Sequence, residues 1–438
     1  MDRIEIGLLM FAGSLVLIAF RMTVAGAMLL AGGLGYAGLV GWSPLMNTMK
    51  TMTYSKFSSY SLSVLPFFLL MGEFATKGGM NTRLFRAARA WVGHWRGGLA
   101  MATIGGSASF GAVCGSSIAT AATMSQVALP EMRKFGYSPA LATGTLAAGG
   151  TLGILIPPSI ILVIYAIYTE QSVGDLFAAA LIPGLIAVGQ YMIVVWLYSR
   201  FVKGAAPQLD KASWRERIEA TLQIWPIAIV FFLIIAGIYR GWFSPTEAAA
   251  IGAAATLVLA VVQGGMRWKG FLEAIYSAGA LTAMMMLIML SAELFAAALA
   301  LSQLPAEISK WVVGLDVGPY TILLFIVLIY LVLGCFMESL AMVLLTLPVF
   351  VPVMLSLDFG VPTEAVLVWF GILVLMSVEI GMITPPFGLN LIVINSMAKD
   401  VPMKDTYVGV LGFVAMDIVR VLLVLFLPIL CLWMPGLM

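Results

Sequence analysis

Charged residues are scarce in this chain: Asp, Glu, Lys and Arg make up 10% of its 438 residues. A soluble domain carries about 25% charged residues, so the composition excludes an ordinary soluble enzyme or binding module. The formal net charge of +2 is too small to indicate nucleic acid as a partner. Apolar residues make up 62% of the chain instead. They recur in runs of roughly 20 residues, which is enough to cross a bilayer.

Residues that hold transition metals or form disulfides are equally rare. His94 is the only histidine and lies in a basic segment, which excludes a histidine-rich metal centre. The three cysteines, Cys114, Cys335 and Cys431, lie in apolar runs without the spacing of disulfide or zinc motifs. The chain also has no phosphate-binding loop of the ATPase type. We therefore expect no cofactor, no transition metal and no ATP site.

Two halves of the sequence resemble each other. The stretch GILIPPSIILVI at 153–164 returns as GMITPPFGLNLIVI at 381–394, which places Pro157 and Pro385 228 residues apart. Three further pairs occur in the same order at nearly the same offset: Glu73 and Glu293, Trp91 and Trp311, and the segments 127–132 and 349–354. This agreement in order and spacing predicts an internal repeat.

The repeat predicts three parts: a first repeat at 1–205, a cytoplasmic linker at 206–218 and a second repeat at 219–438. Each repeat is predicted to contain a re-entrant hairpin followed by a helix that is broken within the membrane. The predicted hairpins are 97–130 and 318–352, and the predicted broken helices are 138–168 and 362–396. Five full crossings then remain in each repeat. Because five is odd, the two repeats are expected to face opposite ways.

Loop charge agrees with this inverted arrangement. The segment from Lys77 to Arg96 and the loop 200–217 are rich in Lys and Arg, so both are expected on the cytoplasmic side. The loops around Glu170 and Asp358 hold no Lys or Arg and are expected outside. Lys50 and Lys56 do not fit a crossing helix and are expected on an interfacial arm.

Proline pairs interrupt an apolar run at the matching place in each repeat: Pro157 and Pro158 in the first, Pro385 and Pro386 in the second. Proline cannot continue a helix, because it lacks a backbone donor and its ring clashes with an earlier carbonyl. Carbonyls freed at bilayer depth must be satisfied, and a bound cation can satisfy them. The alternative is a kink repaired by neighbouring helices. Two breaks at matched positions favour the cation.

The predicted hairpin tips carry oxygen atoms as well. The segment 109–125 is rich in small and hydroxylated residues, which suits either close helix packing or a tight tip at 115–117 whose oxygens reach an ion. The second tip holds Glu338 and Ser339. A carboxylate in an apolar run is rarely incidental. Glu338 could ligate a cation, carry a proton or pair with a backbone donor, and Glu379 could support the second break.

Three segments resemble signatures of one family. GSSIATAATMSQVALPEMRKFGYSPALATGTLAAGGTLGILIPPSI, at 115–160, closely resembles the signature region of the large membrane subunit of tripartite ATP-independent periplasmic (TRAP) transporters. GWFSPTEAAAIG at 241–252 and GMITPPFGLNL at 381–391 resemble two further signatures of that subunit. The resemblance covers essentially the whole chain. One departure is Phe387, where a smaller aliphatic residue is expected after the proline pair.

This resemblance implies an all-α polytopic protein of the bacterial inner membrane, built as an inverted-repeat elevator-type transporter. A mobile domain would hold the two hairpins and the two broken helices, and the other helices would form a scaffold. The resemblance also implies Na+ as the coupling ion, with one sodium site at each hairpin and its broken helix. The first site falls on Ser116, Ser117, Gly149, Thr151 and Gly153. The second site falls on Glu338, Ser339, Gly381, Thr384 and Asn390.

The resemblance further implies partners outside this chain: a small four-helix membrane subunit and a periplasmic substrate-binding protein. Membrane lipid would surround the chain. The expected substrate is a small organic anion, such as a C4-dicarboxylate, a sugar acid, a keto acid or a sulfonate, held between the two hairpin tips.

Two alternatives stay open. Proton coupling through Glu338 or Glu379 would replace sodium coupling. An intramembrane enzyme would instead use Glu338 and Glu379 as paired acids, which requires both carboxyl groups in one cavity. No nucleophile or metal cluster resembles an enzyme site, so the sequence favours a transporter.

Overall fold

The computed structural model describes residues 2–315 and 317–437, and this part of the chain is built from helices alone. The first half contains α1 (Arg3–Ala19), α2 (Val24–Val40), α3 (Trp42–Phe57), the 3₁₀ turn η1 (Tyr60–Ser63), α4 (Val64–Lys77), α5 (Met80–Val92), α6 (Gly98–Cys114), α7 (Ser117–Lys134), α8 (Pro139–Leu155), α9 (Ile160–Thr169) and α10 (Val173–Phe201).

The second half contains α11 (Trp214–Tyr239), α12 (Pro245–Val262), α13 (Trp268–Ser302), α14 (Leu304–Val313), α15 (Pro319–Gly334), α16 (Ser339–Leu355), α17 (Thr363–Ile383), α18 (Leu389–Met397), α19 (Met403–Phe426), the short α20 (Ile429–Leu432) and the 3₁₀ turn η2 (Pro435–Leu437). Within the described residues, seven helical spans are long and apolar enough to cross a membrane, counting α8 and α9 as one span. The protein is therefore a multi-pass membrane protein.

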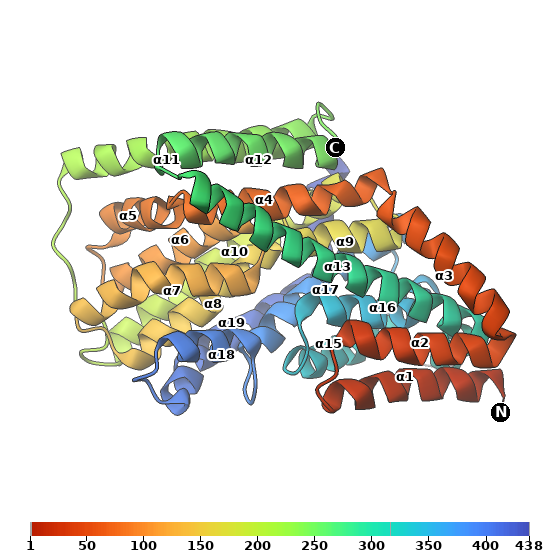
Figure 1. Ribbon diagram of the computed structural model, residues 1–438. Coiled ribbons are helices and arrows are strands. Elements are labelled where there is room, and N and C mark those ends of the chain that lie inside the picture. Colours follow the sequence, from red (N-terminus) through yellow and green to blue (C-terminus); the bar gives the residue numbers. More distant parts are fainter. Residues whose placement is uncertain (1, 316, 438) are drawn as a thin grey trace.

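The order of elements is the same in the two halves. Each half has a helical hairpin followed by a broken helix: α6–α7 with α8–α9, and α15–α16 with α17–α18. Each hairpin packs against the broken helix of its own half (Figure 1). The helix bounds lie within a few residues of the predicted hairpins and broken helices. The opposite orientation of the two halves stays a prediction.

The main difference from expectation is α5, which occupies the segment predicted as a basic loop. Its sequence, MNTRLFRAARAWV, is amphipathic: Leu84 and Phe85 are buried, whereas Arg86 is exposed. Arginine is a good helix former, so the basic residues do not prevent a helix that buries its other face. A segment this short and this charged could not be recognised from apolar length.

The arm predicted around Lys50 and Lys56 is the helix α3, which meets the η1–α4 segment at a bend of 55°. Its residues are mostly exposed or half-buried, and Lys56 pairs with Glu293 of α13 at 3.2 Å. In the second half the single 35-residue helix α13 occupies the place of α3 and α4. The two halves therefore share an order of elements without being identical.

Burial separates an inner group of helices from an outer group. Every residue from Val366 to Ile383 in α17 is buried, as is every residue from Leu141 to Leu155 in α8. By contrast, α11 exposes large apolar side chains along its length, among them Leu222, Trp225 and Phe232. Such a surface is typical of contact with lipid. In the outer group α2 packs on α13, and α4 packs on α12.

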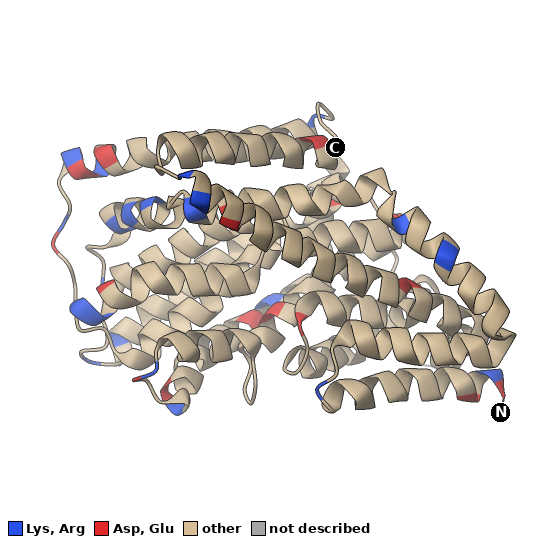
Figure 2. Cartoon of the chain, in the orientation of Figure 1, with Lys and Arg blue, Asp and Glu red and all other residues tan. Residues whose placement is uncertain are grey.

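Basic side chains gather at one end of the helix bundle, near α5 and the start of α11 (Figure 2). There Lys77 pairs with Glu273 at 2.6 Å, and Arg83 donates to the backbone carbonyl of Gln263. The indole of Trp91 donates to Thr221 at 3.0 Å. Gln208 of the 200–217 loop donates to the carbonyl of His94 at 2.8 Å, so this loop lies at the same end, as expected if these basic segments face the cytoplasm.

Candidate functional site

The first hairpin turns at Gly115 and Ser116. Gly115 adopts a positive φ of 66°, which ends α6 and which glycine reaches without strain. Ser116 then caps α7, because its hydroxyl accepts a hydrogen bond from the backbone N–H of Ala119. The structure therefore has a tight turn at the predicted tip, 115–117, and contact of its oxygens with an ion stays a prediction.

The first hairpin touches the first broken helix at Gly153. A methyl group on Gly153 would lie 2.7 Å from Thr120 Oγ1, 3.1 Å from the carbonyl oxygen of Ser116 and 3.2 Å from the Cα of Gly111. Only a glycine allows this approach. Oxygen atoms from the hairpin therefore lie directly against the backbone of α8, one turn before the break at Pro157 and Pro158.

Several oxygens in this region are buried without a partner. Within the described residues, Thr120 Oγ1 and Ser107 Oγ accept and donate no hydrogen bond. Ser107 Oγ faces Gly149, since a methyl group there would lie 2.9 Å away. An unpaired buried hydroxyl costs free energy and calls for a missing partner, such as water or an ion. Thr120 and Ser107 were not selected from the sequence, although both lie in or beside the hydroxyl-rich run.

Asn390 lies against the first hairpin. Its side-chain Nδ2 donates to Ser117 Oγ at 2.8 Å and to the carbonyl of Ala147 at 3.1 Å. Its Oδ1 is buried and has no partner within the described part of the chain. The sequence assigned Asn390 to the second site. The structure shows that it connects α18 of the second half to α7 and α8 of the first.

Thr151 points away from the hairpin tip. Its hydroxyl bonds the carbonyl of Ala148 at 2.8 Å and lies 3.3 Å from the hydroxyl of Tyr191 on α10. The side chains predicted for the first sodium site therefore do not all face the same point. Ser116 and Gly153 face one another at the tip, whereas the Thr151 side chain faces α10.

The second hairpin turns at Glu338. Its carboxylate caps α16 by accepting a hydrogen bond from the N–H of Ala341 at 3.2 Å, and Ser339 Oγ donates to it at 3.1 Å. The sequence allows three roles for Glu338: ligating a cation, carrying a proton or pairing with a backbone donor. The backbone pairing is present in the structure, and the other carboxylate functions remain predictions.

The second hairpin also meets its broken helix through glycine. A methyl group on Gly334 would lie 3.0 Å from the Cα of Gly381. This contact matches that between Gly111 and Gly153 in the first half. Thr384 ends α17, with its hydroxyl bonded to the carbonyl of Ile380 at 2.6 Å. Phe387, half exposed, packs on Phe336 of the hairpin with ring centres 5.1 Å apart.

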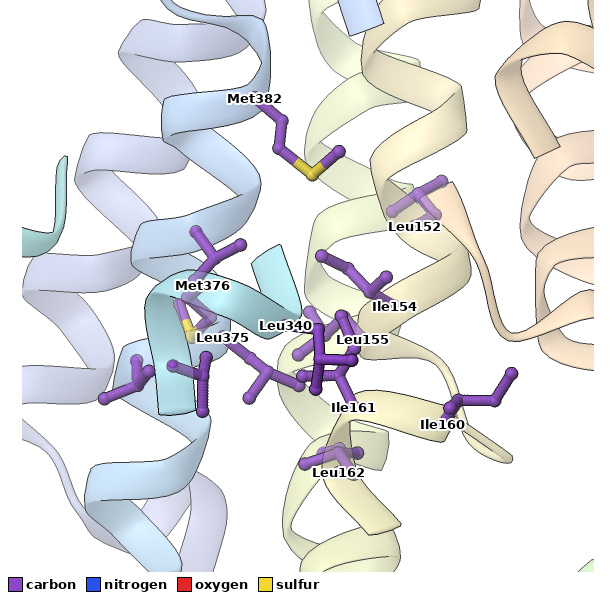
Figure 3. Close-up of a cluster of buried hydrophobic side chains, with 14 of the residues drawn as sticks. Leu152, Ile154, Leu155, Ile160, Ile161, Leu162, Leu340, Leu375, Met376 and Met382 are labelled. Atoms are coloured by element: carbon purple, nitrogen blue, oxygen red, sulfur yellow. The ribbon is translucent and has the colours of Figure 1, made fainter. Parts of the chain in front are cut away.

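Each hairpin also touches the broken helix of the other half. Ser117 at the start of α7 bonds Asn390 of α18. At the matching place, Leu340 in the first turn of α16 packs beside Leu155 and Ile161 at the first break (Figure 3). The first contact is polar and the second is apolar. Both hairpins and both broken helices therefore form one continuous inner unit.

A buried network of charged side chains lies between α17 and α19. Of its members, only Glu379 was singled out from the sequence. Arg420 of α19 pairs with Glu379 of α17 at 2.8 Å and with Asp417 at 3.0 Å. All three side chains are fully buried. The three-residue spacing of Asp417 and Arg420 within an apolar run was the available signal. Glu379 is thus engaged by Arg420, whereas Glu338 bonds Ala341 and Ser339.

The chemistry of the inner unit suits a cation bound through oxygen. The described residues contain no group of three or more His, Cys, Asp or Glu side chains able to hold a metal. The available donors are carbonyls, hydroxyls, an amide oxygen and the Glu338 carboxylate, which are ligands for hard cations. The pocket lined by Arg86, Arg89 and Lys211 lies at the basic end, beside the C-terminal end of α7 and away from the hairpin tips.

The fold and these paired helix breaks define a helical membrane transporter. Residues 11–430 match the family described as "Tripartite ATP-independent periplasmic transporter, DctM component". The chain belongs to this family, as the large permease subunit of a TRAP transporter. Membership and the apolar spans place it in the bacterial inner membrane as a multi-pass protein, and its relatives are permeases rather than enzymes.

Individual relatives agree with this assignment. The chain is 38% identical to the C4-dicarboxylate TRAP transporter large permease protein DctM of Pseudomonas aeruginosa over 379 residues, covering 86% of each chain. It is 33% identical to the sialic acid TRAP transporter large permease protein SiaM of Vibrio cholerae over 380 residues, covering 86% of this chain and 87% of that one.

A solved structure supports the fold. The YdaH transporter of Alcanivorax borkumensis superposes with a TM-score of 0.63, covering 94% of this chain and 97% of that chain at 15% identity. At this level of identity the likeness concerns the fold alone.

Proposed function

We propose that this permease drives uptake of a small organic anion with sodium, using one cation site at each hairpin and its broken helix. The observation that carries this proposal is the cluster of oxygens at the first break. Ser116 carbonyl and Thr120 Oγ1 face Gly153, and Thr120 Oγ1 has no partner among the described residues. Sodium would satisfy these oxygens, whereas the Ile154 carbonyl at the break already accepts a hydrogen bond from Ser159 Oγ at 2.6 Å.

The second site is proposed at the matching place, with Glu338, Ser339, Gly381 and Thr384. The contact of Gly334 with Gly381 supports it, because it repeats the contact of Gly111 with Gly153. Asn390 belongs with the first hairpin in this scheme. Because Asn390 bonds Ser117, a shift of the first hairpin on sodium binding would also shift the second broken helix.

The anion is proposed to bind between the two hairpin tips. The N-terminal ends of α7 and α16 begin at these tips, and a helix N-terminus favours negative charge through the N–H groups that the Ser116 and Glu338 caps leave unbonded. Sodium at both breaks would add positive charge nearby. Substrate binding would therefore be strengthened once both cations are in place.

Sodium coupling supplies enough energy for uptake. With two sodium ions, a monoanion enters with one net positive charge, which gains about 2.3 kcal/mol per 100 mV of membrane potential. A sodium gradient adds to this amount. A dianion enters with no net charge and depends on the sodium gradient alone. Neither term requires a covalent intermediate or ATP.

The inner unit is proposed to move as an elevator against the outer helices, with the halves in opposite orientation. Support comes from the interlocked contacts of both hairpins with both broken helices, which favour movement as one body. The lipid-exposed α11 and the pairs α2–α13 and α4–α12 would form the fixed scaffold. A small four-helix membrane subunit and a periplasmic substrate-binding protein are proposed to complete the transporter, in line with the tripartite family.

The substrate class is proposed from the relatives. The Pseudomonas relative is named for C4-dicarboxylates and the Vibrio relative for sialic acid, both of which carry carboxylate groups. A carboxylate is therefore the first substrate to test. A relative named for isethionate makes a sulfonate the second substrate to test.

Uptake into proteoliposomes tests the proposal. The chain is reconstituted with its small subunit and binding protein, and uptake of labelled substrate is measured under a sodium gradient or a pH gradient. We expect uptake with sodium alone. Uptake driven by a pH gradient in sodium-free buffer would refute sodium coupling and favour proton coupling, with Glu338 as the freer carboxylate because Glu379 is engaged by Arg420.

A further inference from the structure

A buried chain of polar side chains connects the two broken helices. Thr151 of α8 lies 3.3 Å from the hydroxyl of Tyr191, which donates to Asp417 Oδ2 at 2.7 Å. Asp417 pairs with Arg420 at 3.0 Å, and Arg420 pairs with Glu379 of α17 at 2.8 Å. The chain thus runs from the first broken helix through α10 and α19 to the second.

This network is expensive to bury, so its presence needs a reason. All five side chains are fully buried, and removing charges from water costs more than a surface ion pair returns. Apolar side chains of similar size would pack α19 against α8, α10 and α17 at lower cost. Apolar contacts, however, do not fix the relative position of the helices. A hydrogen bond does, because it constrains both distance and angle.

We infer that Tyr191, Asp417 and Arg420 are positioning residues that hold both broken helices in register, so that the two ion sites are organised together. They touch neither hairpin tip and act through Thr151 and Glu379. Thr151 lies between Gly149 and Gly153, and Glu379 lies two residues before Gly381. A shift of Thr151 or Glu379 would therefore displace the backbone of one site. The inference relies on the proposed function for the sodium sites.

The contacts of each member predict how much its substitution costs. Asp417 accepts a hydrogen bond from Tyr191 and forms an ion pair with Arg420, whereas Glu379 is contacted by Arg420 alone. Among the described residues no hydrogen-bond partner meets Glu379 Oε1, Asp417 Oδ1, or Nε and Nη1 of Arg420. One base faces two acids, so Glu379→Gln leaves a balanced pair of Asp417 and Arg420. Arg420→Gln leaves two acids without a base, which is strongly destabilising. Because both ion pairs use Nη2, Arg420→Lys retains the charge and is expected to rescue part of the loss.

Sodium-dependent stabilisation separates positioning from simple packing. The purified chain is heated in NaCl or choline chloride at constant ionic strength, and the rise in Tm is followed against sodium concentration. Tyr191→Phe is expected to raise the half-saturating sodium concentration about two- to tenfold, as one lost hydrogen bond allows. Tyr137→Phe is the matched control, since it removes a buried hydroxyl that accepts from the N–H of Leu99, away from the network. It should lower the basal Tm and leave sodium half-saturation unchanged.

A second measurement tests the inference in the absence of sodium. Tyr191 and Glu379 do not touch one another but lie on opposite sides of Asp417 and Arg420. In choline chloride, Tyr191→Phe, Glu379→Gln and the double variant are compared by Tm. The network predicts a clearly non-additive effect. Additive effects, or wild-type sodium half-saturation in Tyr191→Phe, would overturn the inference. If sodium fails to stabilise the wild type, the sodium proposal fails instead, and this cycle still decides whether the network couples the helices.

Discussion

Replacing Gly153 with alanine tests the proposed first site most specifically. The added methyl group would lie 2.7 Å from Thr120 Oγ1 and 3.1 Å from the Ser116 carbonyl oxygen, closer than packed atoms normally approach. The hairpin must therefore move away from α8 by several tenths of an ångström. Overpacking of this kind costs about 1–3 kcal/mol. If the cost falls on the sodium-bound state, half-saturating sodium rises about 5- to 150-fold.

The assay is the sodium dependence of Tm and of substrate uptake in the complete transporter. Gly189→Ala is the control, because Gly189 lies in the middle of α10 and a methyl group there meets nothing within 4 Å. Alanine also favours the helix by up to about 1 kcal/mol, so the control should match or exceed the wild-type Tm. Equal sodium affinity in Gly153→Ala and Gly189→Ala would refute the placement of a cation between the first hairpin and the first break.

Three further substitutions test other contacts. Asn390→Ala removes the donor to Ser117 and Ala147 and should cost about 1–3 kcal/mol, measured as a lower Tm; an unchanged Tm would show that this link between the halves is dispensable. Gly381→Ala brings a methyl group 2.5 Å from the Cα of Gly334 and should lower both Tm and uptake, whereas Gly279→Ala, with nothing nearby, should lower neither. Glu338→Ala removes the α16 cap at a cost of about 1 kcal/mol and should also weaken sodium binding; Glu338→Asn keeps a cap without the charge, so wild-type sodium affinity in Glu338→Asn would reduce Glu338 to a structural role.

The sequence predicted the hairpins and breaks well because their signals are local. The proline pairs end α8 and α17 whatever the tertiary contacts of these helices. Gly115 and Ser116 likewise specify a tight turn through their own backbone and capping preferences. By contrast, α5 was expected as a loop. Its helix depends on burying Leu84 and Phe85 against the rest of the protein, which apolar length does not show.

Only part of the site geometry could be predicted from the sequence. Ser116 and Gly153 were selected correctly as neighbours across the hairpin and the break. Thr151 and Asn390 were assigned by resemblance to the family's motifs, which does not specify where each side chain points, and side-chain direction on a helix changes by about 100° per residue. Thr151 therefore faces Tyr191, and Asn390 faces the other half. The pairing of Glu379 with Arg420 spans 41 residues and depends on how α17 packs against α19, which no local pattern specifies.

Direct sodium binding to the purified protein tests the central claim most directly. Binding of radioactive sodium is measured at equilibrium for the wild type, Gly153→Ala, Gly381→Ala and the double variant, with choline chloride holding the ionic strength constant. At a sodium concentration that just saturates the wild type, two related sites predict saturable binding of two ions to the wild type, fewer ions to each single variant, and the fewest to the double variant. Absence of saturable binding in a folded wild type, or two ions bound to the folded double variant, would contradict the account.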